Sequence, residues 1–369
     1  MFMTTSPETI PSPLAPAPAQ PRGAASLRGG GGLLRYLVVR FLLIFPTIFV
    51  LVTVVFFLMR ATGDPITAAQ GGRLAPAELA RRIHAAGYDR PLIVQYLDFL
   101  GGILHGDFGT TYSDHQPVTT VLVTYGTATL ELAFYALIVA FIVGIPLGML
   151  AAWIRDRWGD ALLRVLAIVF YATPIFFSGL LMKLVFSIRL GWLPVDGRAD
   201  TGTELELQLL PHPTGIYLID AFRTGDPAAV GDVLRHAVLP GVALGLLTAG
   251  VFLRLVRTNV IGTLNTEYVT AARSRGVSEY RLVTKHAYRP ALIPIITVIG
   301  LQIAMLLGGA VLTETTFEWN GLGYQLNHYL EARDFVAVQG IVALLAVIVA
   351  VVNFIVDVIA AFIDPRVRY

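Results

Sequence analysis

Long apolar runs separated by polar segments dominate the pattern along the chain. The first run, over 37–59, is long enough to cross about 30 Å of hydrocarbon at 1.5 Å per helical residue. Similar runs cover 126–153, 161–190, 236–260, 291–312 and 335–362. Only helices satisfy every backbone polar group within one segment in lipid. The pattern therefore predicts an all-α integral membrane protein with six transmembrane helices.

The polar segments between these runs divide the chain into regions. Residues 1–32 are rich in Pro, Ala, Ser and Gly, which predicts a disordered tail. The first transmembrane helix is expected within 33–60, and an external region with short interfacial helices, at 76–86 and 92–104, within 61–118. The other five helices fall in 119–363, which includes a polar loop at 262–290. An insert at 196–232 is expected to be loop with at most one short helix, at 214–222, and 364–369 form a C-terminal tail.

Composition agrees with a membrane protein and excludes several chemistries. Of the 369 residues, 55% are hydrophobic and 14% are charged, which is too apolar for an average soluble domain. The net charge of +2 implies no nucleic-acid partner. Because the chain has no cysteine, it has no disulfide, thiol nucleophile or thiolate metal site.

Basic residues are concentrated in alternate connecting segments. They include Arg155, Arg157 and Arg164 after the second run and many arginines around the connection between the fourth and fifth. The opposite connections are longer and carry most of the acids. The positive-inside rule therefore predicts that both termini and the 262–290 loop are cytoplasmic.

The polar stretch over 267–294 is predicted to form a short helix that ends at a glycine, followed by a second helix that ends at prolines before the next apolar run. Asn265 or Thr266 can cap the first helix, and Ala271 with Ala272 form a small face that another backbone can approach. Gly276 supplies the left-handed position at which that helix ends. The stretch is therefore predicted to be a docking surface, against the alternative of an ordinary solvated hairpin.

Within the spans, small and ionisable residues stand out. Four glycines, at two i, i+4 spacings, offer faces where helices can pack closely: Gly144, Gly148, Gly241 and Gly245. Glu131, Lys183 and Asp357 are costly in hydrocarbon. Snorkelling or interhelical hydrogen bonding is expected for these three in preference to a direct transport role.

No catalytic or metal-binding constellation is present in the sequence. It lacks the G-x-x-x-x-G-K-[ST], G-x-S-x-G and H-E-x-x-H motifs, so catalytic residues, bound cofactors and an ATP site are not expected in this chain. The histidines of the external segments have no ligand-like spacing, and no metal site is expected: His84, His105, His115, His212 and His328.

The 267–294 stretch resembles the cytoplasmic EAA loop of permease subunits of binding-protein-dependent ABC importers, in the dipeptide, oligopeptide and nickel branch. The matching elements are Glu267-Tyr268-Val269, Ala271-Ala272-Arg273, Arg275-Gly276 and His286-Ala287. Thr270 stands where the general loop has an acidic residue, and Arg289-Pro290 where the branch usually has Arg-Asn. The resemblance implies ATPase-coupling roles for ten residues: Glu267, Tyr268, Thr270, Ala271, Ala272, Arg273, Arg275, Gly276, Arg281 and His286.

Other segments continue the resemblance over nearly all of 36–369, with the insert at 196–232 and the N-terminal tail outside it. Arg60-Ala61-Thr62-Gly63-Asp64-Pro65 and Gly106-Asp107-Phe108-Gly109-Thr110 are similar to external elements of the branch. Gly321-Leu322-Gly323 and Asp364-Pro365-Arg366 match later ones in the right order. Each of these short turn-forming segments is weak evidence alone, but their occurrence in the same order along the chain is specific for the family.

The resemblance implies a type I ABC importer permease in a bacterial-type cytoplasmic membrane. It would form half of a pathway for peptides, with a second permease, two ATPase subunits that bind ATP and Mg, an extracytoplasmic substrate-binding protein and membrane lipid as partners. The alternatives are a permease for nickel or another small solute, an ion-driven secondary transporter, and a channel or scaffold. The sequence leaves open the substrate and whether the second permease is a second copy.

Overall fold

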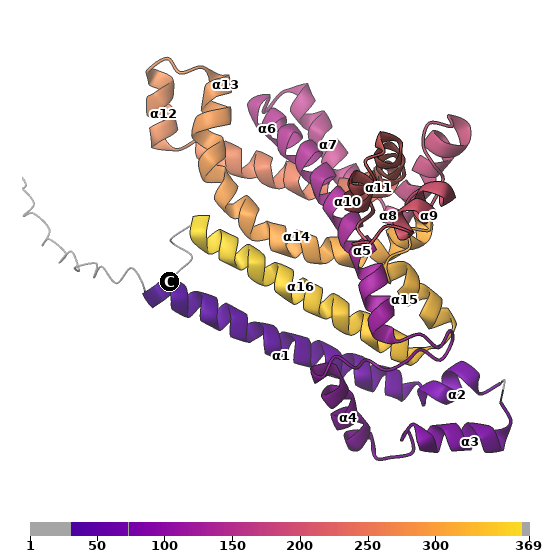
Figure 1. Ribbon diagram of the computed structural model, residues 1–369. Helices are drawn as coiled ribbons and strands as arrows, with labels where there is room; N and C mark the ends of the chain where they lie inside the picture. The colour runs from indigo at the N-terminus through magenta and orange to yellow at the C-terminus, as the bar shows by residue number, and fades with distance from the viewer. Residues whose placement is uncertain (1–30, 73, 364–369) are drawn as a thin grey trace, which may run out of the picture.

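The computed structural model describes residues 31–72 and 74–363, and in this part of the chain the secondary structure is helical, with one isolated β-bridge between Thr110 and Pro117. The predicted tails at 1–32 and 364–369 lie almost entirely outside these residues. In the described residues, five helical segments are long and apolar enough to cross a membrane. One of them continues across a π turn, and three others contain an internal proline. The five segments are α1 (Gly31–Ala61), α5 to α6 (Val118–Val139 and Ile145–Trp153, joined by the π turn η1, Ala140–Gly144), α11 (Pro227–Leu264), α14 (Tyr288–Phe317) and α16 (Phe335–Ile363) (Figure 1).

The third predicted span is broken. Helix α7 (Trp158–Ala172) and the pair α8 (Ile175–Met182) and η2 (Lys183–Arg189) meet at a bend of 102°. Thr173 at the bend is extended, with ψ 124°, because the following Pro174 disfavours helical backbone before it and has no N–H to donate. The apolar run over 161–190 therefore forms two helices at a sharp angle, and the predicted six spans are reached if this bent pair counts as one.

Helix α11 is the centre of the bundle and packs against α5, α6, α7 and α14. The four glycines singled out from the sequence lie at its contact with α5, η1 and α6. A Cβ at Gly144 would lie 2.7 Å from Ala249 O, and one at Gly245 would lie 2.6 Å from Ala136 O. Gly148 and Gly241 face Val256 and Tyr135 in the same way. The close approach is therefore between helices of this chain.

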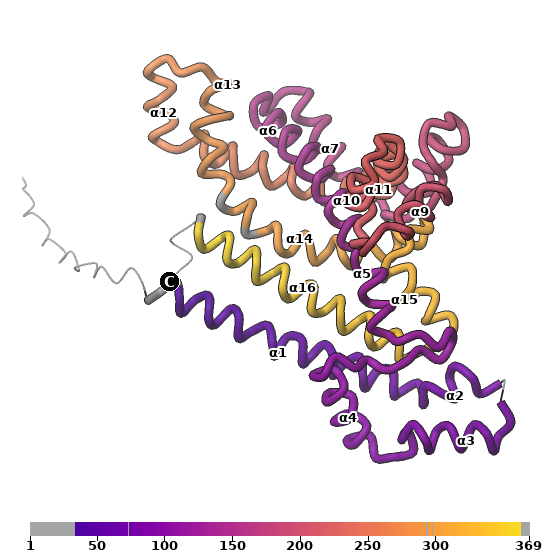
Figure 2. Tube along the Cα trace, viewed as in Figure 1, coloured from indigo at the N-terminus to yellow at the C-terminus, as the bar shows by residue number. Residues whose placement is uncertain are grey.

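The first and last long helices lie side by side. Figure 2 shows the start of α1 next to the end of α16. Arg40 of α1 pairs with Asp357 of α16 at 3.3 Å, and the rings of Phe41 and Phe354 meet edge to face nearby. This contact places the described ends of the chain on one side, as the charge pattern requires.

Short helices cover the other end of the bundle. The expected interfacial helices are present as α3 (Pro76–Ala85) and α4 (Leu92–Leu104), preceded by α2 (Pro65–Gln70). The insert holds two helices, α9 (Thr201–Gln208) and α10 (Tyr217–Thr224), so the prediction of at most one was wrong. Helix α15 (Leu322–Glu331) was not expected from the sequence. The insert is ordered because Leu207, Tyr217 and Val233 share a small apolar core.

Candidate functional site

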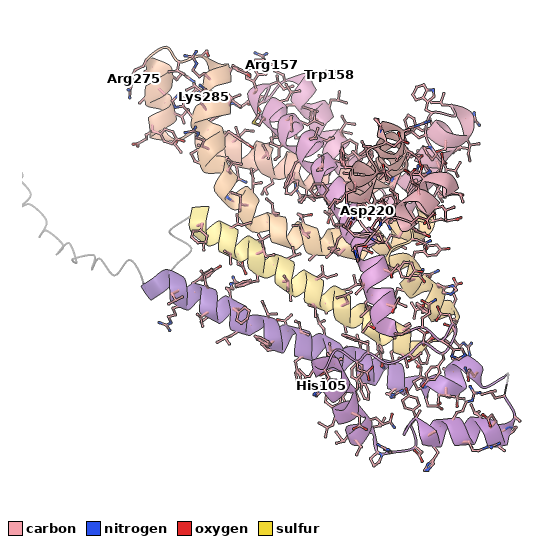
Figure 3. All side chains as sticks on the ribbon, in the orientation of Figure 1. His105, Arg157, Trp158, Asp220, Arg275 and Lys285 are labelled. Carbon is pink, nitrogen blue, oxygen red and sulfur yellow. The ribbon has the colours of Figure 1, made fainter. Side chains whose placement is uncertain are left out.

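The polar stretch forms a short helix, a tight turn and a second helix at the end of the molecule away from α2, α3 and α4. Helix α12 (Glu267–Ser274) is followed by α13 (Glu279–Arg281) and a π turn, η3 (Leu282–Ala287), that runs into α14. Thr266 precedes α12 with extended backbone, but its side chain makes no capping hydrogen bond. Figure 3 shows Arg275 and Lys285 here, at the same end as Arg157 and Trp158 and far from His105.

Gly276 ends α12 in the left-handed conformation that its sequence position predicts. Its φ is +81°, its N–H donates to Arg273 O at 2.9 Å, and the N–H of Val277 donates to Ala272 O at 3.3 Å. This pair of bonds is the Schellman arrangement, which satisfies carbonyls that a helix end leaves free. The turn therefore has a defined geometry that depends on a positive φ at one residue.

One face of this hairpin is fixed to the bundle by apolar contacts. Val269, Leu282 and Val283 are buried in the same core cluster as Val256 and Val260 of α11. The hydroxyl of Tyr268 donates to His286 O at 3.0 Å, which ties α12 to η3. Helix α12 is too short to be stable alone in water, so these contacts hold it in place.

Arg273 closes the turn from the solvent side. Its guanidinium donates to both carboxylate oxygens of Glu279, at 2.6 and 3.2 Å. These hydrogen bonds hold the pKa of Glu279 below its ordinary value. Arg273, a candidate for ion pairing with a partner protein, therefore already has a partner within the chain.

The remaining site residues point to solvent. Seven residues of the predicted docking surface are exposed: Glu267, Tyr268, Thr270, Ala271, Arg275, Gly276 and Arg281. Ala272, Arg273 and His286 are half-buried. Among the described residues, Arg275 and Arg281 have no salt bridge within the chain. The exposed surface of the hairpin therefore combines small residues, Ala271 and Gly276, with unpaired arginines, and its other face is packed on the bundle.

The ends of α6 and α7 brace this hairpin. Arg155 donates to the side-chain oxygen of Asn265 at 3.2 Å, and the rings of Trp153 and Tyr280 meet edge to face with centroids 6.0 Å apart. Nearby, fully buried Asp160 accepts two hydrogen bonds from Arg257 of α11, at 2.6 and 2.7 Å. The segments that flank α12, at Asn265 and Tyr280, are therefore attached to the end of α6.

At the opposite end, Glu131 of α5 holds the insert through a buried ion pair. Its carboxylate is 2.6 Å from Arg198, and the two side chains are 2% and 6% exposed. It also accepts from Tyr135 Oη at 2.9 Å and from the backbone N–H of Leu218, in the first turn of α10, at 2.9 Å. The Arg198 guanidinium lies 3.6 Å from the centre of the Tyr217 ring. The ionisable residue in this span is thus paired between elements, as expected.

Glu314 makes a second buried network between helices α5, α14 and α15. It accepts from Thr129 Oγ1 at 2.7 Å and from the N–H of Tyr324 at 2.9 Å. Thr129 in turn accepts from the N–H of Leu322 at 2.8 Å. A Cβ on Gly321 would lie 2.5 Å from the Glu314 carboxylate, so only glycine fits that position. The network ties the start of α15 to the outer part of α5.

Sequence reasoning did not find the partners of these buried acids. Arg198, Thr129 and Arg257 lie 67, 185 and 97 positions from the acids that they contact. No local pattern links residues so far apart. The weak signal available was the position of Glu131 within an apolar run, which requires a partner but does not identify it. Asp160 and Glu314 lie just outside the predicted runs and gave no such signal.

The described residues bring together no nucleophile, base and oxyanion donors of the kind that a catalytic site needs. The hairpin presents instead a preformed surface with one basic stripe. Such a surface can bind another protein without changing its own shape, and its charges favour an acidic partner.

Comparison with known proteins agrees with this arrangement over nearly the whole chain. Residues 144–369 match the family model described as Binding-protein-dependent transport system inner membrane component. Residues 33–133 match the model for the N-terminal part of such membrane components. Together they include the hairpin around Gly276 and helices α2, α3 and α4.

Individual relatives cover the same range. The chain is 37% identical over 339 residues to the Di/tripeptide transport system permease protein DppB of Pseudomonas aeruginosa, covering 91% of this chain and 99% of that protein. It is 38% identical over 305 residues to the probable D,D-dipeptide transport system permease protein DdpB of Escherichia coli, covering 83% and 88%. In fold it is similar to a chain of the inward-facing MetNI methionine ABC transporter, with a TM-score of 0.50, 18% identity, and coverage of 66% of this chain and 96% of that one. The chain therefore belongs to the family of binding-protein-dependent transport system inner membrane components.

Proposed function

We propose that this chain is a permease subunit of a type I ABC importer, which forms half of a translocation pathway for dipeptides or similar short peptides. The observation that carries the proposal is the hairpin around Gly276. In this chain, which belongs to the family, the exposed short helix α12 is fixed by apolar contacts at the end of the bundle where basic residues are concentrated. Its function is to dock in a groove of an ATPase subunit, so that movement of the ATPase is transmitted through α12 to the bundle.

Relatives support peptides as the substrate class. The similar proteins carry names for di/tripeptide, dipeptide, D,D-dipeptide and glutathione transport systems. All of these compounds contain amide-linked amino acids, and each relative is matched over most of its length. We infer the same class here. The alternative cargo, nickel or another small solute, has no supporting name among these relatives.

The proposal assigns the other components to separate subunits. Two ATPases would bind ATP and Mg, a second permease would complete the pathway, and an extracytoplasmic binding protein would deliver the peptide. The exposed apolar surfaces of α7 and α8 support a second permease, because Ile168, Phe177 and Leu181 are all at least half exposed in the single chain.

Transport by the reconstituted complex tests the proposal. Vesicles would contain this chain, a second permease and the ATPases, with ATP inside and the binding protein and a labelled dipeptide outside. We expect uptake that requires ATP hydrolysis and stops with a non-hydrolysable ATP analogue. Uptake driven by an ion gradient without the ATPases would establish a secondary transporter instead. An active assembly with neither a second permease nor a second copy of this chain would contradict a shared pathway.

The orientation follows from the charge pattern and can be tested separately. Because the chain has no cysteine, Ser278→Cys and Gly202→Cys each create a single reactive thiol at an exposed position. We expect a membrane-impermeant maleimide to label Gly202→Cys from outside intact cells, and Ser278→Cys only after the membrane is opened. Labelling of Ser278→Cys in intact cells would reverse the proposed topology.

A further inference from the structure

Three potential metal ligands converge where the insert meets the start of α11. They are Asp200, which directly precedes α9, and Asp232 and His236, one turn apart on α11. One ligand atom from each residue lies within 4.8 Å of the others. His236 was not among the histidines considered from the sequence because it falls at the start of a predicted span, and Asp200 lies on a different element.

His236 is buried and oriented for ligation. Its side chain is only 4% exposed, and its Nδ1 lies 2.9 Å from the backbone oxygen and 3.1 Å from the side-chain Oδ1 of Asp232. An ion at Nε2 would therefore be reached by Asp232 only through its other carboxylate oxygen, Oδ2. A histidine whose Nδ1–H donates to a carbonyl presents the lone pair of Nε2 to a ligand. Among the described residues Nε2 makes no hydrogen bond, and Asp200 Oδ1 lies 3.7 Å from it. This is the relation expected of two atoms that share an ion, since ligands about 2.1 Å from zinc lie about 3.4 Å apart in a tetrahedral site.

The carboxylates of Asp232 and Asp200 differ in how freely they can move: Asp232 is held in place, whereas Asp200 is exposed. Asp232 is 16% exposed and is held by the N–H of Asp200, which donates to its Oδ2 at 2.8 Å. The Asp200 side chain is 81% exposed, so it can rotate toward an ion without disturbing the core.

We propose that Asp200, Asp232 and His236 bind a divalent transition-metal ion of the zinc class on the outer face of this permease. One imidazole nitrogen and two carboxylate oxygens are a donor set that suits such ions. The ion connects the N-terminus of α9 to α11 and so fastens the outer part of the insert, in addition to the Glu131–Arg198 pair that holds its inner part. The role is structural and independent of the peptide that is transported.

Zinc titration of the purified full-length chain tests the site. The chain must be purified without a polyhistidine tag, and its lack of cysteine removes thiolates as competing ligands. We expect about one zinc ion per chain, with at least about tenfold weaker binding in Asp200→Asn, since even outer-shell substitutions at metal sites cost about 10–100-fold. Asp196→Asn is the matched control because it removes one exposed carboxylate from the same loop.

A second measurement separates ligation from non-specific binding. Zinc should slow proteolysis of the insert in the parent chain and in Asp196→Asn, but not in Asp200→Asn or His236→Gln, because an ion that binds only the folded site stabilises it. Equal zinc affinity in Asp200→Asn and Asp196→Asn would overturn the proposal, as would the absence of saturable binding to the parent chain. Both readouts are independent of transport, so failure of the proposed function would not imitate either result.

Discussion

Gly276→Val is expected to uncouple the permease from its ATPase while leaving the bundle folded. The residue has φ +81°, a region that a β-branched side chain occupies only with strain of about 1–3 kcal/mol. An added Cβ would meet no atom within 4 Å, so the cost is confined to the backbone of the turn. Relief of the strain breaks the bonds of Gly276 and Val277 to α12 and rotates the exposed helix. At matched membrane abundance, we expect loss of ATPase co-purification or of peptide-stimulated ATP hydrolysis.

Two controls make this experiment specific. Gly276→Asn should retain most coupling, because asparagine tolerates the left-handed region. Gly262→Val introduces the same side chain near the same end of the molecule, at a glycine that is exposed, in α11 and without a positive φ. If Gly276→Val transports and binds ATPase like the parent chain, the hairpin is not the coupling element. In that case its arginines serve only to set topology.

Glu131→Ala should cause the largest loss of stability. It leaves Arg198 buried without its counterion and removes the acceptor for Tyr135 and for the first turn of α10. Removal of one member of a buried ion pair typically costs about 3–5 kcal/mol. We expect a clearly lower unfolding temperature in detergent, with the insert around α10 becoming sensitive to protease before the long helices do.

An exposed ion pair supplies the contrast. Glu78 pairs with Arg81 and Arg82 on α3 at 3.2 and 3.1 Å, and all three side chains are well exposed. Exposed pairs contribute about 0–1 kcal/mol, so Glu78→Ala should hardly change the unfolding temperature. The double variant Glu131→Gln with Arg198→Met should recover part of the loss, because it leaves no unpaired charge. A Glu131→Ala protein as stable as Glu78→Ala would show that the insert is held mainly by its apolar core.

The long helices could be predicted from the sequence because the bilayer imposes one requirement, an apolar run of sufficient length. The break at Pro174 was also encoded locally, yet the apolar run continues through it, and hydropathy alone cannot distinguish a bent pair from a straight span. Helix α15 was missed because its apolar face is short and because glycines, which disfavour a helix, lie at its cap (Gly321) and in its first turn (Gly323). The helices of the insert depend on Leu207 and Val233, whose contact is tertiary.

The turn at Gly276 could be predicted from the sequence, whereas the buried ion pairs of Glu131 and Asp160 could not. The conformation of Gly276 follows from its neighbours, since a helix that ends at a glycine needs few distant contacts to define its turn. The pairings of Glu131 and Asp160 do not, because Arg198 and Arg257 come from other helices or loops. The sequence indicated that Glu131 required a partner but gave no such indication for Asp160, and only the fold identified the partner of either acid.

The contact between α1 and α16 has a consequence for biogenesis. Of the described helices, α1 is synthesised before all the others, and α16, which supplies Asp357 and Phe354, after all the others. Until synthesis is complete, Arg40 is near hydrocarbon without its carboxylate partner, and α1 is held on the protein side chiefly by the external helix α4, through Thr53 and Tyr96. A chain released before α16 would therefore keep an unpaired cation in α1, where a charge near hydrocarbon is costly.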